Sequence, residues 1–257
     1  MGFGLRGLHC EHRAEWTAAG IPGETMKLTS ALCLLTWAVT ADVAPAGASP
    51  LAQRVAEAYG VQRFDQIDAI RYTFNIEKGD AHMARSWVWE PKARRVTYHG
   101  KGAAGDTITY RYEQSKVDTT QAEMKFVDAR FVNDQYWFLY PFHLAWDSMA
   151  TITEAEADSL PDHSGVARHL TVTYPKDGGY SPGDVYELFL GADDRITHWI
   201  FRPGGSTEQR LVFTWGGNRQ VGPIMVSTEH SSPDGAFKIR FSDVAVRLKG
   251  RDDWITQ

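Results

Sequence analysis

The sequence predicts a mainly β (α+β) fold, in which a large curved antiparallel sheet forms a half-open barrel, plugged by short helices, with an N-terminal helix. Two observations indicate it. Most of the chain after residue 70 alternates apolar and polar residues, which is typical of strands with one buried and one wetter face. Turn-forming residues separate these runs without long helical patterns between them, which favours a meander closing towards a barrel over a βαβ fold.

A leader is expected to precede the sheet. Met26 opens a start with one lysine, an apolar stretch over 28–39 follows, and Ala46-Gly47-Ala48 supplies a small-x-small cleavage motif. About a dozen apolar residues are too few to span a bilayer, which argues against a membrane anchor. We therefore expect a signal peptide over 26–48, cleaved after Ala48, and a protein that acts in the periplasm or is secreted. Residues 1–25 are expected to be a spurious extension.

Residues 49–257 are expected to form a single half-barrel domain. Both cysteines, Cys10 and Cys33, precede it, so it can form no disulfide and must be stabilised by its core. A chain of about 210 residues can bury roughly 70% of its unfolded surface. The full chain of 257 residues has 27 Lys and Arg against 32 Asp and Glu, without a basic run. This balance argues against a nucleic-acid partner and against electrostatic docking on anionic lipid.

One helix is expected at the start of this domain. Ser49 suits an N-cap, Pro50 fits the first helical position, and Gly60 suits the end. Leu51, Val55 and Ala58 then share one face of the helix. A short amphipathic turn is expected next, over 64–70.

The expected strands fall into two groups. Six runs alternate and should have one buried face: 72–76, 87–89, 108–112, 170–174, 211–215 and 237–241. Two runs are apolar on both faces and should be central or covered on both sides: 185–190 and 196–201. Beyond residue 241 the apolar parity changes, since Val244 and Val246 continue on even numbers. This change predicts a bulge or bend near Ser242-Asp243.

The segment 131–146 breaks the alternation because it is apolar nearly all round. An element that is apolar on every side must be surrounded by other elements. Asn133 or Asp134 is available as an N-cap, and Pro141 limits a helix that begins there to about two turns. We therefore expect a short helical plug inside the curved sheet.

The string Gly179-Tyr180-Ser181-Pro182-Gly183 matches the nucleophile elbow of hydrolases, G-x-S-x-G. The elbow requires a helix after the serine, whereas residues 184–190 have the pattern of a strand. It also requires a backbone N–H on the residue after the serine, and Pro182 has none. A hairpin loop explains the string, and we expect no hydrolase site here.

An enzyme remains the alternative function, with a polar site at the barrel mouth. His143 and Asp147 are four residues apart and would share a helix face, and Asp184 could join them. The other histidines lack metal-ligand spacing and follow separate turns or strands. We therefore expect no metal and no cofactor, and we name no catalytic residue.

The aromatic residues give the leading hypothesis. Plain core is expected for most of them, but some can line a pocket for an apolar ligand, because Trp and Tyr combine a large apolar face with one polar group. The candidate ligand-binding residues are Trp87, Trp89, Tyr110, Tyr136, Phe138, Tyr140, Phe142, Trp146 and Trp199.

The order of these features resembles the periplasmic lipoprotein-carrier superfamily, which includes the Lol carrier and receptor proteins and mycobacterial lipid-carrying lipoproteins. The likeness runs from Ser49 to about Leu248, with strings such as 131–142 and 178–190. It implies a half-open barrel around a cavity for acyl chains, and hence a non-enzymatic carrier of a hydrophobic, lipid-like ligand. It also implies transient contact with the membrane or with envelope proteins. The chain lacks a lipobox, which favours a soluble protein, and we expect a monomer.

Overall fold

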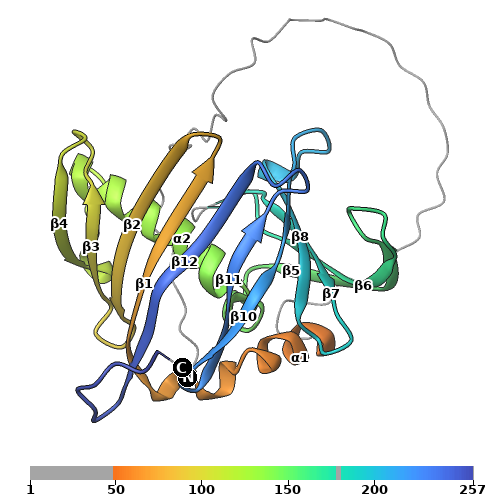
Figure 1. Cartoon of the computed structure of the whole chain (residues 1–257), viewed down its shortest axis with the longest axis horizontal. Coiled ribbons are helices and arrows are strands. Elements are labelled where there is room, and N and C mark those ends of the chain that lie inside the picture. The colour runs from red at the N-terminus through yellow and green to blue at the C-terminus, as the bar shows by residue number, and fades with distance from the viewer. Residues whose placement is uncertain (1–48, 178–180, 257) are drawn as a thin grey trace, which may run out of the picture.

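The computed structural model of the protein describes residues 49–177 and 181–256 (Figure 1). The expected extension and signal peptide, residues 1–48, lie outside this part of the chain. The described residues form two antiparallel sheets, neither of which closes into a barrel. The predicted mainly β, half-open fold is therefore confirmed.

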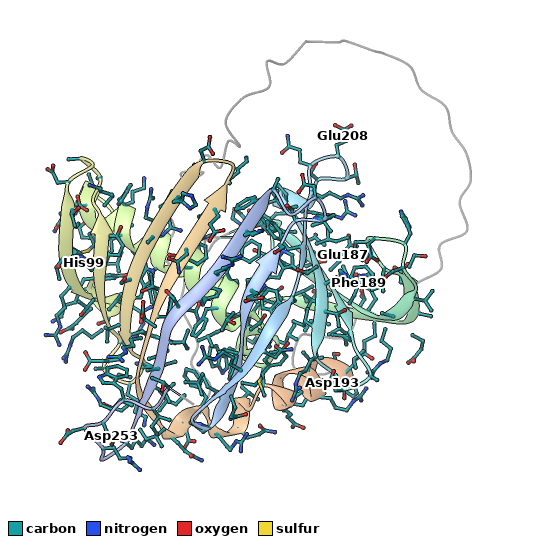
Figure 2. All side chains as sticks on the ribbon, viewed as in Figure 1. His99, Glu187, Phe189, Asp193, Glu208 and Asp253 are labelled. Carbon is teal, nitrogen blue, oxygen red and sulfur yellow. The ribbon has the colours of Figure 1, made fainter. Side chains whose placement is uncertain are left out.

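The larger sheet has seven strands, in the order β10-β11-β12-β1-β2-β3-β4. Their bounds are β1 (Ile67–Lys78), β2 (Ala81–Glu90), β3 (Arg95–Lys101), β4 (Thr107–Glu113), β10 (Gly216–Val221), β11 (Ile224–Ser231) and β12 (Phe237–Leu248). The alternation works as expected on β1, where Tyr72 and Phe74 are buried while Thr73 and Asn75 are partly exposed. Charged side chains such as Asp253 lie at the periphery (Figure 2).

The smaller sheet has five strands, in the order β5-β6-β7-β8-β9. Their bounds are β5 (Thr151–Ser159), β6 (Val166–Thr173), β7 (Val185–Leu190), β8 (Ile196–Arg202) and β9 (Leu211–Thr214). Trp215 joins the two sheets: its backbone N–H donates to the Thr197 carbonyl at 2.7 Å, and β10 of the larger sheet follows directly. Thr214 also bonds to the backbone of Ser231 on β11.

Four strands went unpredicted, namely β3, β5, β10 and β11. Strand β5 carries Glu154, Glu156 and Asp158, all exposed, so its sequence lacks the apolar alternation that predicts a strand. The strand lies at a sheet edge, where backbone pairing with β6 holds it although few of its side chains are buried. Strand β10, which begins Gly216-Gly217, is likewise an edge strand, and backbone pairing with β11 holds it.

The predicted bulge on the last strand is confirmed. The register between β1 and β12 shifts between Arg71 and Thr73, whose partners are Ala245 and Ser242. Asp243 has a φ of 54°, a left-handed conformation, and its carboxylate accepts from the Thr73 hydroxyl at 3.1 Å. The extra residue restores the buried face beyond the bulge.

The N-terminal helix α1 (Pro50–Ala58) is also as predicted. The Ser49 hydroxyl accepts from the Ala52 backbone N–H at 3.0 Å, and Leu51 and Val55 are buried. Gly60 has a φ of 88° and leads into the short 3₁₀ turn η1 (Val61–Gln66). Two further 3₁₀ turns are η2 (Gln114–Lys116) and η3 (Pro203–Gly205).

The plug is a much longer helix than predicted. Helix α2 spans Ala122–Trp146, with Gln121 as its N-cap, so neither Asn133 nor Asp134 begins it. Pro141 does not end the helix, which breaks at Leu139 (φ −120°, ψ 23°) and then continues. A proline inside a helix costs about 3 kcal/mol, and burial against both sheets offsets that cost. None of the described helices combines the length and hydropathy that a bilayer-crossing segment needs.

The segment with the elbow-like string continues as β7, a strand, as predicted. Ser181 lies in a bend just before it, and Gly179 and Tyr180 lie outside the described residues. The helix that a nucleophile elbow requires is therefore absent after Ser181.

Phe138 tests how tightly α2 is packed. Its ring stacks on Tyr72 at 4.5 Å and lies 4.8 Å from the Phe241 ring, between centroids. Phe138→Ala should lower the free energy of unfolding by about 3–5 kcal/mol in urea denaturation, since it leaves a cavity. Met149→Ala, at a residue 73% exposed, is the control and should change it by less than about 0.5 kcal/mol. A loss below about 1 kcal/mol at Phe138 would contradict close packing.

Candidate functional site

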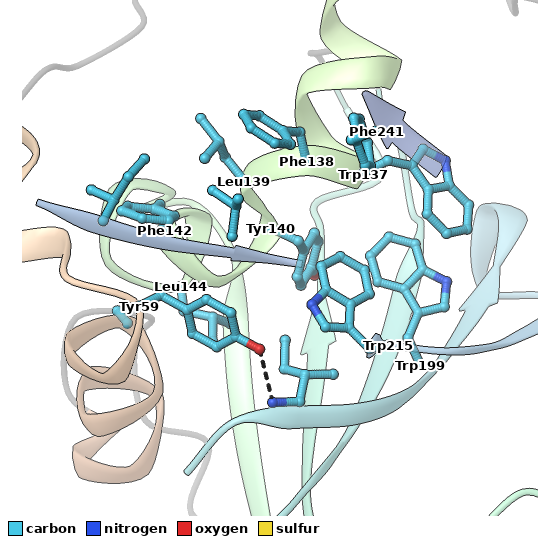
Figure 3. Close-up of a cluster of buried hydrophobic side chains, with 14 of the residues drawn as sticks. Tyr59, Trp137, Phe138, Leu139, Tyr140, Phe142, Leu144, Trp199, Trp215 and Phe241 are labelled. Carbon is cyan, nitrogen blue, oxygen red and sulfur yellow. Dashed lines mark hydrogen bonds between the residues drawn. The ribbon is translucent and has the colours of Figure 1, made fainter. Parts of the chain in front are cut away.

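The site candidates centre on the second half of α2, where it lies between the two sheets (Figure 3). Trp137 stacks on Trp199 of β8, with centroids 4.6 Å apart, and Trp199 stacks on Trp215 at 5.1 Å. Tyr140 meets Trp199 edge-on at 4.9 Å. This aromatic cluster connects α2 to the smaller sheet and to the junction of the two sheets.

The first half of α2 contacts the larger sheet in a similar way. Phe131 packs edge-on against Trp87 at 5.4 Å and Trp89 at 5.8 Å, both on β2. Beyond the break, Phe142 and Trp146 surround Phe64 of η1. One helix therefore provides the shared core of both sheets.

All nine candidate ligand-binding residues belong to this core or pack against it. Five are buried: Trp87, Phe138, Tyr140, Phe142 and Trp199. Four are half-buried: Trp89, Tyr110, Tyr136 and Trp146. The structure thus places the nine in one packed core or against it.

Two hollows in the described surface lie elsewhere. One, of about 550 Å³, is lined largely by polar residues of β1, β2, β10, β11 and β12, including His82, Arg219 and Arg240. The other, of about 360 Å³, lies beside β4 and includes Arg95 and Lys116. None of the nine candidate side chains lines either hollow.

A buried ion pair lies where β2 meets α2. Arg85 donates to both carboxylate oxygens of Asp134, at 2.8 and 2.6 Å, and the two side chains are 4% and 0% exposed. Trp87 Nε1 and Asn133 Nδ2 donate to the same carboxylate at 2.8 and 2.9 Å. Burial raises the pKa of Asp134, and the charge and hydrogen bonds of Arg85 oppose the rise.

Sequence reasoning missed this pair. The position of Arg85 in β2 could have revealed it, because alternate residues of a strand share a face and Arg85 therefore shares one with Trp87 and Trp89. Asp134 was considered only as a helix cap. To predict the pair, one would need to know that two segments 49 residues apart in the sequence lie close together in space.

A second polar network ends α2. Asp147 accepts from the hydroxyls of Tyr136 and Tyr174, at 2.8 and 2.7 Å, and from His143 Nδ1 at 3.0 Å. The other ring nitrogen of His143 lies 2.9 Å from Gln135 Oε1. Burial alone would raise the pKa of Asp147, but His143 and the two tyrosines together hold it below its usual value.

The structure therefore brings together only part of the alternative site. His143 and Asp147 are bonded, as their spacing predicted, whereas the Asp184 carboxylate accepts from the Gly204 backbone N–H at 2.7 Å. Burial raises the pKa of Asp184. Within residues 49–177 and 181–256, no three His, Cys, Asp or Glu side chains converge in a way that could hold a metal ion.

Several buried polar atoms in the core lack a hydrogen-bond partner, among them Tyr72 Oη, Trp199 Nε1 and both ring nitrogens of His230. The His230 ring lies 4.2 Å from that of Trp215, between centroids. Burial lowers the pKa of His230 to about 3, and a contact with the Thr214 backbone opposes this shift in part. Such groups are costly in an apolar interior.

No protein-family model matches the chain, and no curated protein matches it. Solved structures to which it is similar include a DUF1329 family protein from Desulfovibrio piger, with 10% identity, a TM-score of 0.41, and coverage of 79% of this chain and 94% of that one. A putative outer membrane lipoprotein-sorting protein domain from Vibrio parahaemolyticus has 10% identity and a TM-score of 0.39, with coverage of 78% of this chain and 95% of that one. Lipoprotein LppX from Mycobacterium tuberculosis has 7% identity and a TM-score of 0.30, with coverage of 76% of this chain and 96% of that one.

Two of these similar structures are thus a lipoprotein-sorting domain and a lipoprotein. Identities of 10% or less and TM-scores of 0.41 or less carry no argument about ligand or activity. The function therefore follows only from the residues of this chain.

The buried ion pair allows a direct test. Asp134→Asn should lower the free energy of unfolding by about 3–5 kcal/mol in urea denaturation, because it leaves the Arg85 guanidinium buried without a counter-charge. The double variant Arg85→Met, Asp134→Leu should recover much of that loss. Asp253→Asn, in an exposed pair with Arg251, is the control and should leave the midpoint unchanged. Equal losses in the single and double variants would argue against an uncompensated buried charge.

His230 predicts a pH dependence of stability. Unfolded His230 binds a proton below about pH 6.5, whereas the folded side chain stays neutral down to about pH 3. Its contribution is therefore complete above about pH 6.5, and it falls by roughly 1.4 kcal/mol per pH unit below that. Urea denaturation at pH 7.5, 6.5 and 5.5 should show this loss in the wild type, and His230→Phe should reduce it to the smaller loss that His169 and His198 contribute, since burial lowers their pKa as well. His163→Gln, at an exposed residue, should keep it; parallel profiles for wild type and His230→Phe would contradict the assignment.

Proposed function

We propose that the protein is an exported, non-enzymatic carrier of a hydrophobic, lipid-like ligand, held between α2 and the concave faces of the two sheets. The observation that supports this most is the buried helix itself. From Phe126 to Leu144 no residue of α2 is exposed, and its partners are mostly aromatic side chains from both sheets. Such an interior suits acyl chains, because each buried methylene contributes about 0.8 kcal/mol.

The break in α2 would allow the second half of the helix to move relative to the first. At Leu139 the backbone leaves the helical conformation, and Pro141 has no N–H to donate. Fewer internal hydrogen bonds then resist a swing of the segment 140–146. A displacement there would separate the aromatic cluster and open apolar space next to the smaller sheet.

The candidate binding residues fit this proposal in two groups. The buried members, such as Phe138, Tyr140 and Trp199, would line the space that opens. The half-buried Trp89, Tyr136 and Trp146 lie where an arriving chain would make its first contacts. The unpaired Trp199 Nε1 would donate to an ester or carbonyl oxygen of the ligand.

The enzyme alternative gains no such support. Both ring nitrogens of His143 have partners, which leaves no free base, and Asp184 makes a separate contact. The proposal therefore includes neither a catalytic residue nor a cofactor. It does include a monomer that acts after export and meets the membrane or envelope proteins transiently.

The carrier proposal predicts copurification with an apolar molecule. Native mass spectrometry and organic extraction of the exported protein should reveal it, and delipidation should lower the melting temperature. Added fatty acid should restore the temperature by mass action, since ligand at 100 times its Kd stabilises by about 2.7 kcal/mol.

Trp89→Ala should weaken ligand retention more than it weakens the fold, because the residue is half-buried, and Met149→Ala is the matched exposed control. An empty extract, together with a melting temperature that fatty acids and phospholipids leave unmoved, would end the carrier proposal. The aromatic cluster would then be ordinary core.

A further inference from the structure

Tyr72 and Arg85 are neighbours on the face of the larger sheet that α2 covers. In the register of β1 and β2, Tyr72 pairs with Trp87 and Phe74 pairs with Arg85, so Tyr72 and Arg85 are diagonal neighbours. Tyr72 is buried and its hydroxyl has no hydrogen-bond partner. A strong donor is therefore held next to a guanidinium group without an acceptor.

Arg85 uses only part of its guanidinium group on Asp134. Nε and Nη2 donate to the carboxylate, whereas Nη1 has the Met83 sulfur, 3.3 Å away, as its partner. The guanidinium carbon also lies 4.8 Å from the centroid of the Phe74 ring. A thioether is a weak acceptor, so Nη1 would bond more strongly to an oxygen.

Arg130 adds a second cation. It precedes Asp134 by one helical turn, on the same face of α2, and is half-buried with its guanidinium carbon 3.6 Å from the Phe126 ring centroid. Within the described part of the chain, no ion pair or hydrogen bond engages its guanidinium group. Glu123, earlier on the helix, bonds to the Ala103 backbone N–H instead. Two guanidinium groups therefore lie near the Asp134 carboxylate, and only Arg85 forms an ion pair with it.

We propose that Tyr72, Arg85 and Arg130 bind the anionic head of the ligand, which makes the carried molecule an amphiphile with a carboxylate or phosphate on an apolar tail. This inference rests on the carrier function proposed above. The anion would accept from the Tyr72 hydroxyl and from the guanidinium donors, and it would give Arg130 an ion pair. The tail would lie against the aromatic side chains of α2.

Three probes of the full chain separate head from tail: oleate, methyl oleate and acetate. Native mass spectrometry and thermal shift should show oleate bound at least about tenfold more tightly than methyl oleate, and acetate not bound. Tyr72→Phe, which keeps the ring, and Arg130→Gln should each weaken oleate about tenfold and leave methyl oleate unchanged. Lys125→Gln, an exposed cation on the same helix, is the control and should affect neither.

Equal binding of oleate and methyl oleate, or variants that weaken both probes alike, would overturn the anionic head site and leave the carrier function standing. Acetate bound as tightly as oleate would overturn the amphiphile, since the site would then be a simple anion site. A chain that binds neither oleate nor methyl oleate would contradict the carrier function and the head site together.

Discussion

Every residue of helix α2 from Trp137 to Leu144 is buried, and this constrains the rest of the fold. Water cannot solvate the face that one sheet leaves uncovered, so a second sheet has to cover it. Tyr72 and Trp87 of the larger sheet and Trp199 of the smaller one meet the helix from different directions. The chain then passes from one sheet to the other at Trp215, which allows both to surround one helix.

The buried polar groups fall into two sets, one hydrogen-bonded and one with unpaired donors. In the Asp147 network the carboxylate accepts from Tyr136, His143 and Tyr174, and these bonds connect the end of α2 to the residue after β6. The region around Arg85 is incomplete, because Tyr72 Oη has no acceptor and Arg130 has no counter-ion among the described residues. A hydrogen-bonded network stabilises the fold, whereas buried donors without an acceptor are groups to which a bound molecule can supply one.

The candidate site was predictable to the extent that its signals were local. The aromatic residues followed from composition, and the contact of His143 with Asp147 followed from a spacing of four on a helix. The ion pair did not, because Arg85 and Asp134 are 49 residues apart and belong to different elements. The sequence also could not distinguish core from pocket, since the same side chains suit both.

The sequence by itself determined the cap at Ser49, the alternating strands and the bulge at Asp243. Each depends on residues within a few positions, and a one-residue slip would turn a buried face outward. Only the tertiary structure decided that α2 runs through Pro141 and that β5 is a strand. The first depends on burial between two sheets and the second on backbone pairing with β6. Those stabilising contacts come from segments distant in sequence, which no local pattern contains.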